Sequence, residues 1–280
     1  MMLLSCLFAP QRASAAWGHN PYAPSSLPGV AGVTAVAAVS DSVGGCYVAA
    51  STSTGLYLLH VLGDGSPDPA WPSPGRLLSA AVGATDLQIV TAIGSGVWVS
   101  WKLGTPSDVF VSRVTGAGNL APNIVTGGIN LTSESQFSEQ AYGLRIAVSP
   151  TTGALFMAWS QEFYDVSNGR RNTDVYAALV AQNSNLISWN GAVANFQYSD
   201  EYGPVVACTP EGDLAVVFNY SGARVFKSVN PANGEVGVLM QLNSNSSSSS
   251  QVAAKVPPIL VGCSGRRFLV FSWSYYFANG

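Results

Sequence analysis

GVWVSWKLGTPSDVFVSRVTGAGNL, residues 96–120, is the stretch whose pattern the rest of the chain repeats. Its first residues, GVWVSW, are rich in β-branched and aromatic side chains, which is typical of a half-buried strand. After a short polar loop, DVFVSRV at 108–114 alternates between two sets of side chains, as a second strand would. TGAGN at 115–119 predicts a turn, because Gly and Asn adopt positive φ at low steric cost.

The same unit recurs along the chain and is marked by a glycine before its central strand. The marker glycines are Gly45, Gly96, Gly153 and Gly212, with separations of 51 (45 to 96), 57 (96 to 153) and 59 (153 to 212) residues. A fifth copy begins at 258–273. Each full unit has one further strand candidate before the marker glycine and another at its end. A period near 50 residues with four short strands indicates a β-propeller. We therefore predict an all-β fold with about five recognisable blades, each a four-stranded antiparallel meander.

Two short motifs carry a family resemblance. DGSPDPAW at 64–71 resembles the turn of the bacterial delta-sixty repeat, and DVFVSRV and DVYAALV (174–180) are similar to the DIYAQRV-type strand of secreted bacterial β-propeller repeat proteins. The resemblance covers roughly residues 35–276 and implies a propeller on a secreted or cell-surface protein. It implies no catalytic residues, because these families share none that could be carried over. The unit at 204–243 departs from the pattern, since Ala223 stands where the leading Asp is expected.

Composition excludes several classes of function. Only 10% of the residues are charged, 48% are hydrophobic and 29 are Gly, which is typical of all-β extracellular proteins. A net charge of −3 gives no electrostatic basis for binding nucleic acid. No run of 18 or more apolar residues is present, so we expect no membrane span.

The two ends of the chain suggest its organisation. The apolar MMLLSCLF at 1–8, followed by Ala-Ser-Ala at 13–15, resembles the end of a secretory signal with its cleavage site. We therefore assign residues 1–16 to a signal-peptide remnant and 17–280 to a single propeller domain with an incomplete last blade, on a secreted or cell-surface protein. Either residues 25–34 cross over to complete the fifth blade, or the chain is a truncated propeller. The second alternative is favoured here.

Residues for covalent or metal chemistry are scarce. The only histidines are His19 and His60, and the cysteines form no metal-binding pattern, so we assign no catalytic residue, metal site or cofactor. Asp64 and Asp68 either form part of a calcium loop or, as we favour, stabilise a turn through bonds to the backbone. Cys208 and Cys263 hold the same position in consecutive units, and two free thiols are preferred over a disulfide.

One face of the propeller is the best candidate for ligand binding. In a four-stranded meander, the loop between the second and third strands opens on the same face as the connection between blades. The 14-residue segment 160–173 is the longest such loop, and long loops with aromatic and charged residues are frequent binding sites. The predicted ligand-binding residues are Glu162, Phe163, Tyr164, Asp165, Arg170, Arg171, Glu201 and Tyr202.

Two functions remain open. The leading hypothesis is a binding or adhesion scaffold for an unidentified glycan or protein, and the residues favour a non-enzymatic role. The alternative is a carbohydrate-active hydrolase or lyase that uses acidic residues of the same face. Carboxylates about 5 or 9 Å apart in a central pocket would favour a glycosidase. Trp101, Trp159 and Trp273 end their strands in register, and we expect them to pack between blades rather than stack on sugars.

Overall fold

The chain is an all-β protein, as predicted. A computed structural model describes residues 30–132, 140–165, 169–182, 187–194, 200–220, 223–242, 252–253, 259–271 and 274–275. Every regular element in these ranges is a β-strand, so this part of the chain offers no helix that could cross a membrane.

Four consecutive units form four-stranded antiparallel meanders, which confirms the predicted blade. The first sheet contains β1 (Ala35–Ser40), β2 (Cys46–Thr52), β3 (Gly55–Val61) and β4 (Arg76–Ser79). The second contains β5 (Thr85–Thr91), β6 (Val97–Leu103), β7 (Asp108–Val114) and β8 (Ile129–Asn130). The third contains β9 (Ala141–Val148), β10 (Leu155–Asp165), β11 (Arg170–Val180) and β12 (Ile187–Ala194). The fourth contains β13 (Glu201–Cys208), β14 (Leu214–Tyr220), β15 (Ala223–Val229) and β16 (Met240–Gln241).

The fifth unit is shorter in the described residues. β18 (Ile259–Cys263) pairs with β19 (Arg267–Phe271), and β17 (Val252–Ala253) pairs with β20 (Ser274–Tyr275). Of residues 25–34, which one of the two alternatives has crossing over to the fifth blade, 25–29 lie outside the described part. Thr34 N–H donates to Ser51 O at 2.8 Å, so this residue continues the pairing of β1 with β2 in the first blade.

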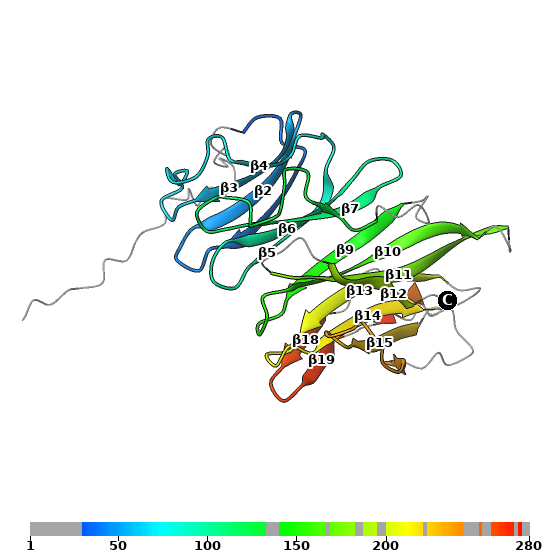
Figure 1. The fold of residues 1–280 in the computed structure, drawn as a ribbon. Coiled ribbons are helices and arrows are strands. Elements are labelled where there is room, and N and C mark those ends of the chain that lie inside the picture. The colour runs from blue at the N-terminus through cyan, green and yellow to red at the C-terminus, as the bar shows by residue number, and fades with distance from the viewer. Residues whose placement is uncertain are drawn as a thin grey trace, which may run out of the picture.

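The sheets are arranged as propeller blades. The inner strand of each sheet lies against the inner strand of the next, in the order β1, β5, β9, β13 and β18 (Figure 1). Together with the four meanders, this arrangement identifies the fold as a β-propeller, as the repeat predicted.

The core lies between the blades. Trp101 packs with Leu58 and Val99 between the first and second blades, and it is fully buried. Trp159, also fully buried, packs with Trp98 and Met157 between the second and third. Phe156 and Phe218 join the third blade to the fourth. Inter-blade packing by Trp101 and Trp159 is therefore confirmed, whereas Trp273 lies outside the described residues. Cys208 and Cys263 are free thiols, as favoured, and Cys46 is also free.

Candidate functional site

The prediction of a loop at 160–173 is wrong, because this segment is a long β-hairpin. Strand β10 continues to Asp165, and β11 begins at Arg170, with Glu162 opposite Thr173 and Tyr164 opposite Arg171. Each of these strands has 11 residues, whereas β6 and β14 have 7. The hairpin therefore projects beyond its neighbours (Figure 1). The extension carries polar residues on both sides, and some of them, such as Gln161 and Asn172, are buried. Alternation of apolar and polar residues therefore does not identify it as a pair of strands.

One side of this hairpin faces the fourth blade. Ser160, Glu162 and Tyr164 share a side because strand residues alternate, and Ser160 Oγ accepts a hydrogen bond from Gly203 N of β13 at 3.1 Å. Glu162 Oε2 lies 3.9 Å from Arg171 Nη1 on this side. Tyr164 is 49% exposed. We call Glu162, Tyr164 and Arg171, together with Tyr142 and Tyr202 beside them, the hairpin surface.

Tyr142 and Tyr202 connect the hairpin surface to the inner strands. Tyr142 OH donates to Thr173 Oγ1 at 3.2 Å. Burial raises the pKa of Tyr142, and the nearby Glu162, Asp200 and Tyr202 raise it further. Tyr202 is 39% exposed. Aromatic and acidic groups from β9, β10 and β13 therefore meet here.

The other predicted residues are placed differently. Phe163 lies on the opposite side of the hairpin with Arg170, whose Nη2 donates to Asn172 Oδ1 at 3.3 Å. The side chain of Asp165 lies outside the described part of the structure. The structure thus places Glu162, Tyr164 and Arg171 on one side of the hairpin and Phe163 and Arg170 on the other. Tyr202 lies near Tyr142, beside the first group.

Glu201 was expected on the surface but is fully buried, and it forms an acid pair with Asp174. Asp174 begins the repeat-like part of β11 and is 3% exposed. The two carboxyl groups share a hydrogen bond. Burial raises the pKa of Asp174 to about 7, and the neighbouring Glu201 and Asp200 add to this. A buried acid that is protonated near neutral pH is a recognised mark of functional sites.

Asp108 shows that the acid pair is not a general property of the repeat. It holds the same position in the second blade, where its Oδ1 accepts from Thr132 Oγ1 at 2.8 Å and its Oδ2 from Asn130 Nδ2 at 3.0 Å. Asp174 Oδ1, in contrast, has no hydrogen-bond partner among the described residues. Sequence reasoning treated Asp174 as a repeat position and missed this role. The available signal was the absence of an Asn-x-Thr partner sequence near the end of β12, which closes with Val193 and Ala194.

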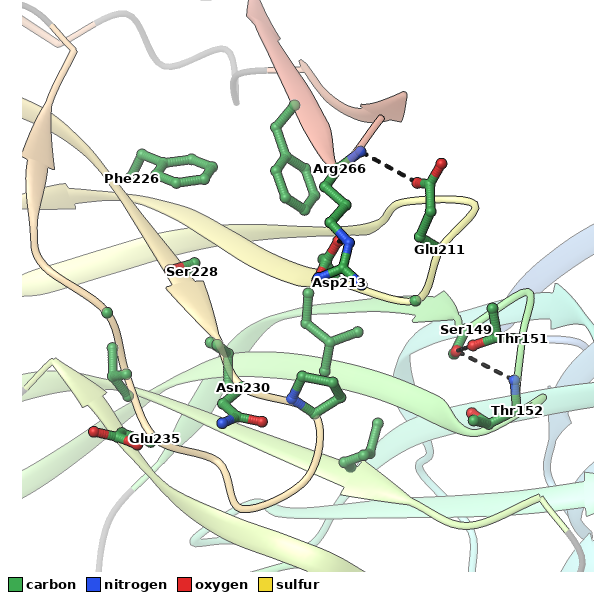
Figure 2. A pocket seen from close by; sticks show the side chains of 18 residues that line it. Ser149, Thr151, Thr152, Glu211, Asp213, Phe226, Ser228, Asn230, Glu235 and Arg266 are labelled. Carbon is green, nitrogen blue, oxygen red and sulfur yellow. Dashed lines mark hydrogen bonds and ion pairs between the residues drawn. The ribbon is translucent and has the colours of Figure 1, made fainter. Parts of the chain in front are cut away.

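A large pocket lies on the opposite face, at the β9–β10, β13–β14, β15–β16 and β18–β19 turns. It has a volume of about 820 Å³ and contains none of the predicted residues. Figure 2 shows Glu211 reaching the turn that carries Arg266. The Glu211 carboxylate accepts from Gly265 N at 2.8 Å and Arg266 N at 3.3 Å. Asp213 Oδ2 accepts from Thr209 Oγ1 at 3.3 Å. The carboxylates of Glu211 and Asp213 therefore form hydrogen bonds that stabilise turns of the fourth and fifth units. Because these acids already have structural partners, we take the hairpin surface and the acid pair, and not this pocket, as the candidate site.

The acidic turn of the first blade has a structural role. Asp64 Oδ1 accepts from Ser66 N at 2.9 Å, and Asp68 Oδ1 accepts from Ala70 N at 2.8 Å. These bonds are those expected of turn-stabilising carboxylates. In the ranges that the structure describes, no three His, Cys, Asp or Glu residues are placed to hold a metal ion.

The sequence matches no protein-family model and no curated protein. Its fold is similar to those of several solved structures. An endo-arabinase from Bacteroides thetaiotaomicron is 10% identical, with a TM-score of 0.45 over 88% of this chain and 94% of that one. An endo-1,4-β-xylanase from the same organism is 10% identical, with a TM-score of 0.41 over 78% and 77%. A protein of unknown function from Dyadobacter fermentans is 10% identical, with a TM-score of 0.48 over 80% and 73%. Function therefore has to be argued from the residues of this chain.

Proposed function

We propose that the protein is a secreted or cell-surface β-propeller that binds a carbohydrate chain at the hairpin surface. The observation that carries the proposal is the exposed ring of Tyr164 on the same side of the hairpin as the Glu162–Arg171 pair. The exposed Tyr202 lies near Tyr142, which in turn lies near Glu162. Aromatic faces pack against the apolar C–H faces of sugars, and charged side chains make strong, directional hydrogen bonds to hydroxyl groups. Paired strands also present these groups with a smaller loss of conformational entropy on binding than an irregular loop would.

The test is a glycan array probed with the purified protein, followed by calorimetric titration of the best-binding oligosaccharide. Tyr164→Ala should weaken binding at least tenfold, since an aromatic contact contributes about 1 kcal/mol or more beyond its buried area. Val125→Ala, at a 68% exposed position of the second blade, is the control and should bind as the unmodified protein does.

A second variant removes the hairpin tip. Residues 163–172 are replaced by Asn-Gly, which joins Glu162 to Thr173 by a two-residue turn. The blade cores are untouched, so the melting temperature should stay within a few degrees while glycan binding is lost. Unchanged affinity in a folded tip-deletion variant would rule out the hairpin surface as the binding site.

Hydrolysis of a glycan is a second candidate, favoured by one observation. Asp174 holds a pKa of about 7, so it could donate a proton at neutral pH. The geometry fits less well, because carboxyl groups of glycosidases stand about 5 Å or about 6.5–9.5 Å apart, whereas Asp174 and Glu201 share a hydrogen bond and are buried. Arabinan and xylan, the polymers implied by the names of two structural neighbours, are the first substrates to test. Hydrolysis that is abolished by both Asp174→Asn and Glu201→Gln would replace the binding proposal with an enzymatic one.

A further inference from the structure

The acid pair joins two blades at a buried position. Asp174 belongs to β11 of the third blade, and Glu201 begins β13, the inner strand of the fourth. Their exposed fractions are 3% and 0%. Two ionised carboxylates in contact at a buried site repel strongly, because the low dielectric weakens the screening between them. A single shared proton turns the repulsion into a hydrogen bond.

We propose that Asp174 and Glu201 form a proton-operated latch between the third and fourth blades, closed while one proton is shared and opened when that proton leaves. The –COOH group of Asp174 donates to the Glu201 carboxylate in the closed state. Loss of the proton to solvent leaves two negative charges in contact and favours separation of β13 from β11.

The charged and titratable groups around the pair decide which acid keeps the proton. Lys227 of β15 lies near Glu201: burial lowers the pKa of Lys227, and the attraction of Glu201 raises it again. Lys227 Nζ donates to Val193 O at 2.8 Å. This cation favours the ionised form of Glu201 and leaves the proton on Asp174.

The remaining neighbours are acids, phenols and one arginine. Asp200, next to Glu201 in the chain, adds negative charge near Asp174. Tyr176 of β11 has its pKa raised by burial and by Asp174. Tyr142 of β9, with Glu162 of β10 near it, completes the acidic side, while Arg224 of β15 lies near Tyr202. Extra negative charge makes the loss of the shared proton more costly, so the neighbours support a closed latch under mildly acidic conditions.

The sign of the pH effect follows from the pKa of Asp174. In the unfolded chain this group titrates near 3.8, and in the folded protein near 7. The folded state therefore binds the proton more tightly, and the resulting stabilisation is complete below about pH 4 and is lost as the pH rises through 7. Between pH 5.5 and pH 8 the protonated fraction of a group with a pKa near 7 falls about tenfold.

Hydrogen exchange of the peptide 200–208 at pH 5.5 and pH 8, corrected for the intrinsic exchange rate, tests the latch. The unmodified protein should lose protection about tenfold in this peptide at pH 8. Asp174→Asn should show no such change, because its amide donates to Glu201 at either pH. Asp108→Asn is the matched control: it alters the same repeat position in the second blade, away from the pair, and should keep the normal pH response. The proposal is overturned if protection in the unmodified protein is independent of pH, or if Asp174→Asn responds to pH as the unmodified protein does.

An infrared measurement keeps the proposal falsifiable should a variant fail to fold. At pH 5.5 the unmodified protein should show the carbonyl band of a protonated, hydrogen-bonded carboxylic acid, and this band should disappear above pH 8. No such band at pH 5.5 would mean that the pair shares no proton and that the latch does not exist.

Discussion

At the scale of single residues, His60 shows how a strand histidine can tie a turn to a blade. Its Nδ1 lies 2.8 Å from Asp68 Oδ2 and its Nε2 lies 3.0 Å from Asp41 Oδ2, while its ring stacks on Tyr47 with the centroids 4.4 Å apart. The stacking places His60 as a strand residue that packs at a blade face. The two carboxylates were not foreseen as its partners, because Asp41 is 19 residues away in the chain.

Replacing His60 by Phe should destabilise the protein. The substitution keeps a ring against Tyr47 but removes both hydrogen bonds to carboxylates, each of which contributes about 1.5–3 kcal/mol. We expect the free energy of unfolding to fall by about 2–4 kcal/mol in urea denaturation. Ser66→Ala, which removes only the exposed bond to Asp64, should change it by less than about 0.5 kcal/mol. Equal stability of the two variants would show that the His60 contacts contribute little.

The same cluster predicts a stability loss in acid. Burial alone would raise the pKa of Asp41, but hydrogen bonds from Val43 N, His60 and Gly45 N lower it overall. The pKa of Asp68 is lowered by hydrogen bonds from Ala70 N and His60. Groups with depressed pKa values stabilise the fold above their unfolded pKa of about 4, and this contribution is lost as the pH falls further. Urea unfolding between pH 5 and pH 2.5 should therefore show a smaller loss in His60→Phe than in the unmodified protein. An identical loss in both would exclude a role for His60 in lowering these pKa values.

At the scale of strands and turns, the sequence predicted most of the elements, and the failures have physical causes. Strands β1, β5 and β13 were predicted from their runs of apolar residues, and in the structure they pack against the inner strands of neighbouring blades. The hairpin of β10 and β11 was predicted as a loop at 160–173 because this segment is rich in polar and charged residues, although Gln161, Asn172 and Thr173 are buried in the structure. The burial of Glu201 could not be predicted from the sequence, because its partner Asp174 is 27 residues away in the chain (174 to 201).

The marker glycine Gly96 offers a test of why the repeat is punctuated by glycine. Gly96 has φ +84° and a Cβ there would collide with the carbonyl oxygen of Val114, whereas Gly94 has φ +79° and open space around it. Gly94→Ala should cost only the conformational strain, about 1–2 kcal/mol. Gly96→Ala should cost about 2 kcal/mol more, because the backbone of the neighbouring strand must move. The difference is measured from the thermal unfolding midpoints of the two variants. Equal destabilisation by both substitutions would mean that glycine is required at position 96 only for its positive φ, and not for the close approach of Val114.

At the scale of the whole molecule, the repeat predicted the architecture because every blade must solve the same packing problem with its neighbours. Trp98, Trp101 and Trp159 recur at the blade interfaces for this reason. The candidate site could be predicted only in part, because its residues lie where the third blade differs in structure from the other blades. Tyr164 and Arg171 lie on the part of the hairpin that extends past its neighbours, and Asp174 has lost the local partners that Asp108 keeps.

The blade-to-blade packing predicts that a local change weakens the entire propeller. Phe156 is fully buried between the third and fourth blades and packs near Trp189 with ring centroids 5.9 Å apart. Phe156→Ala should lower the free energy of unfolding by about 3–5 kcal/mol. Because the cores between blades one and two, two and three, and three and four are continuous through shared sheets, we expect a single cooperative unit.

Hydrogen exchange of the first blade distinguishes this from independent blades. The slowest amides of residues 46–61 lie far along the chain from Phe156, so they should lose protection in Phe156→Ala only if they exchange through global unfolding. The expected loss equals the change in the free energy of unfolding, more than a hundredfold in rate. If hydrogen exchange is unchanged in 46–61 but faster in 155–180, the blades unfold separately. Each blade would then be stabilised only by its own contacts and by those with its direct neighbours.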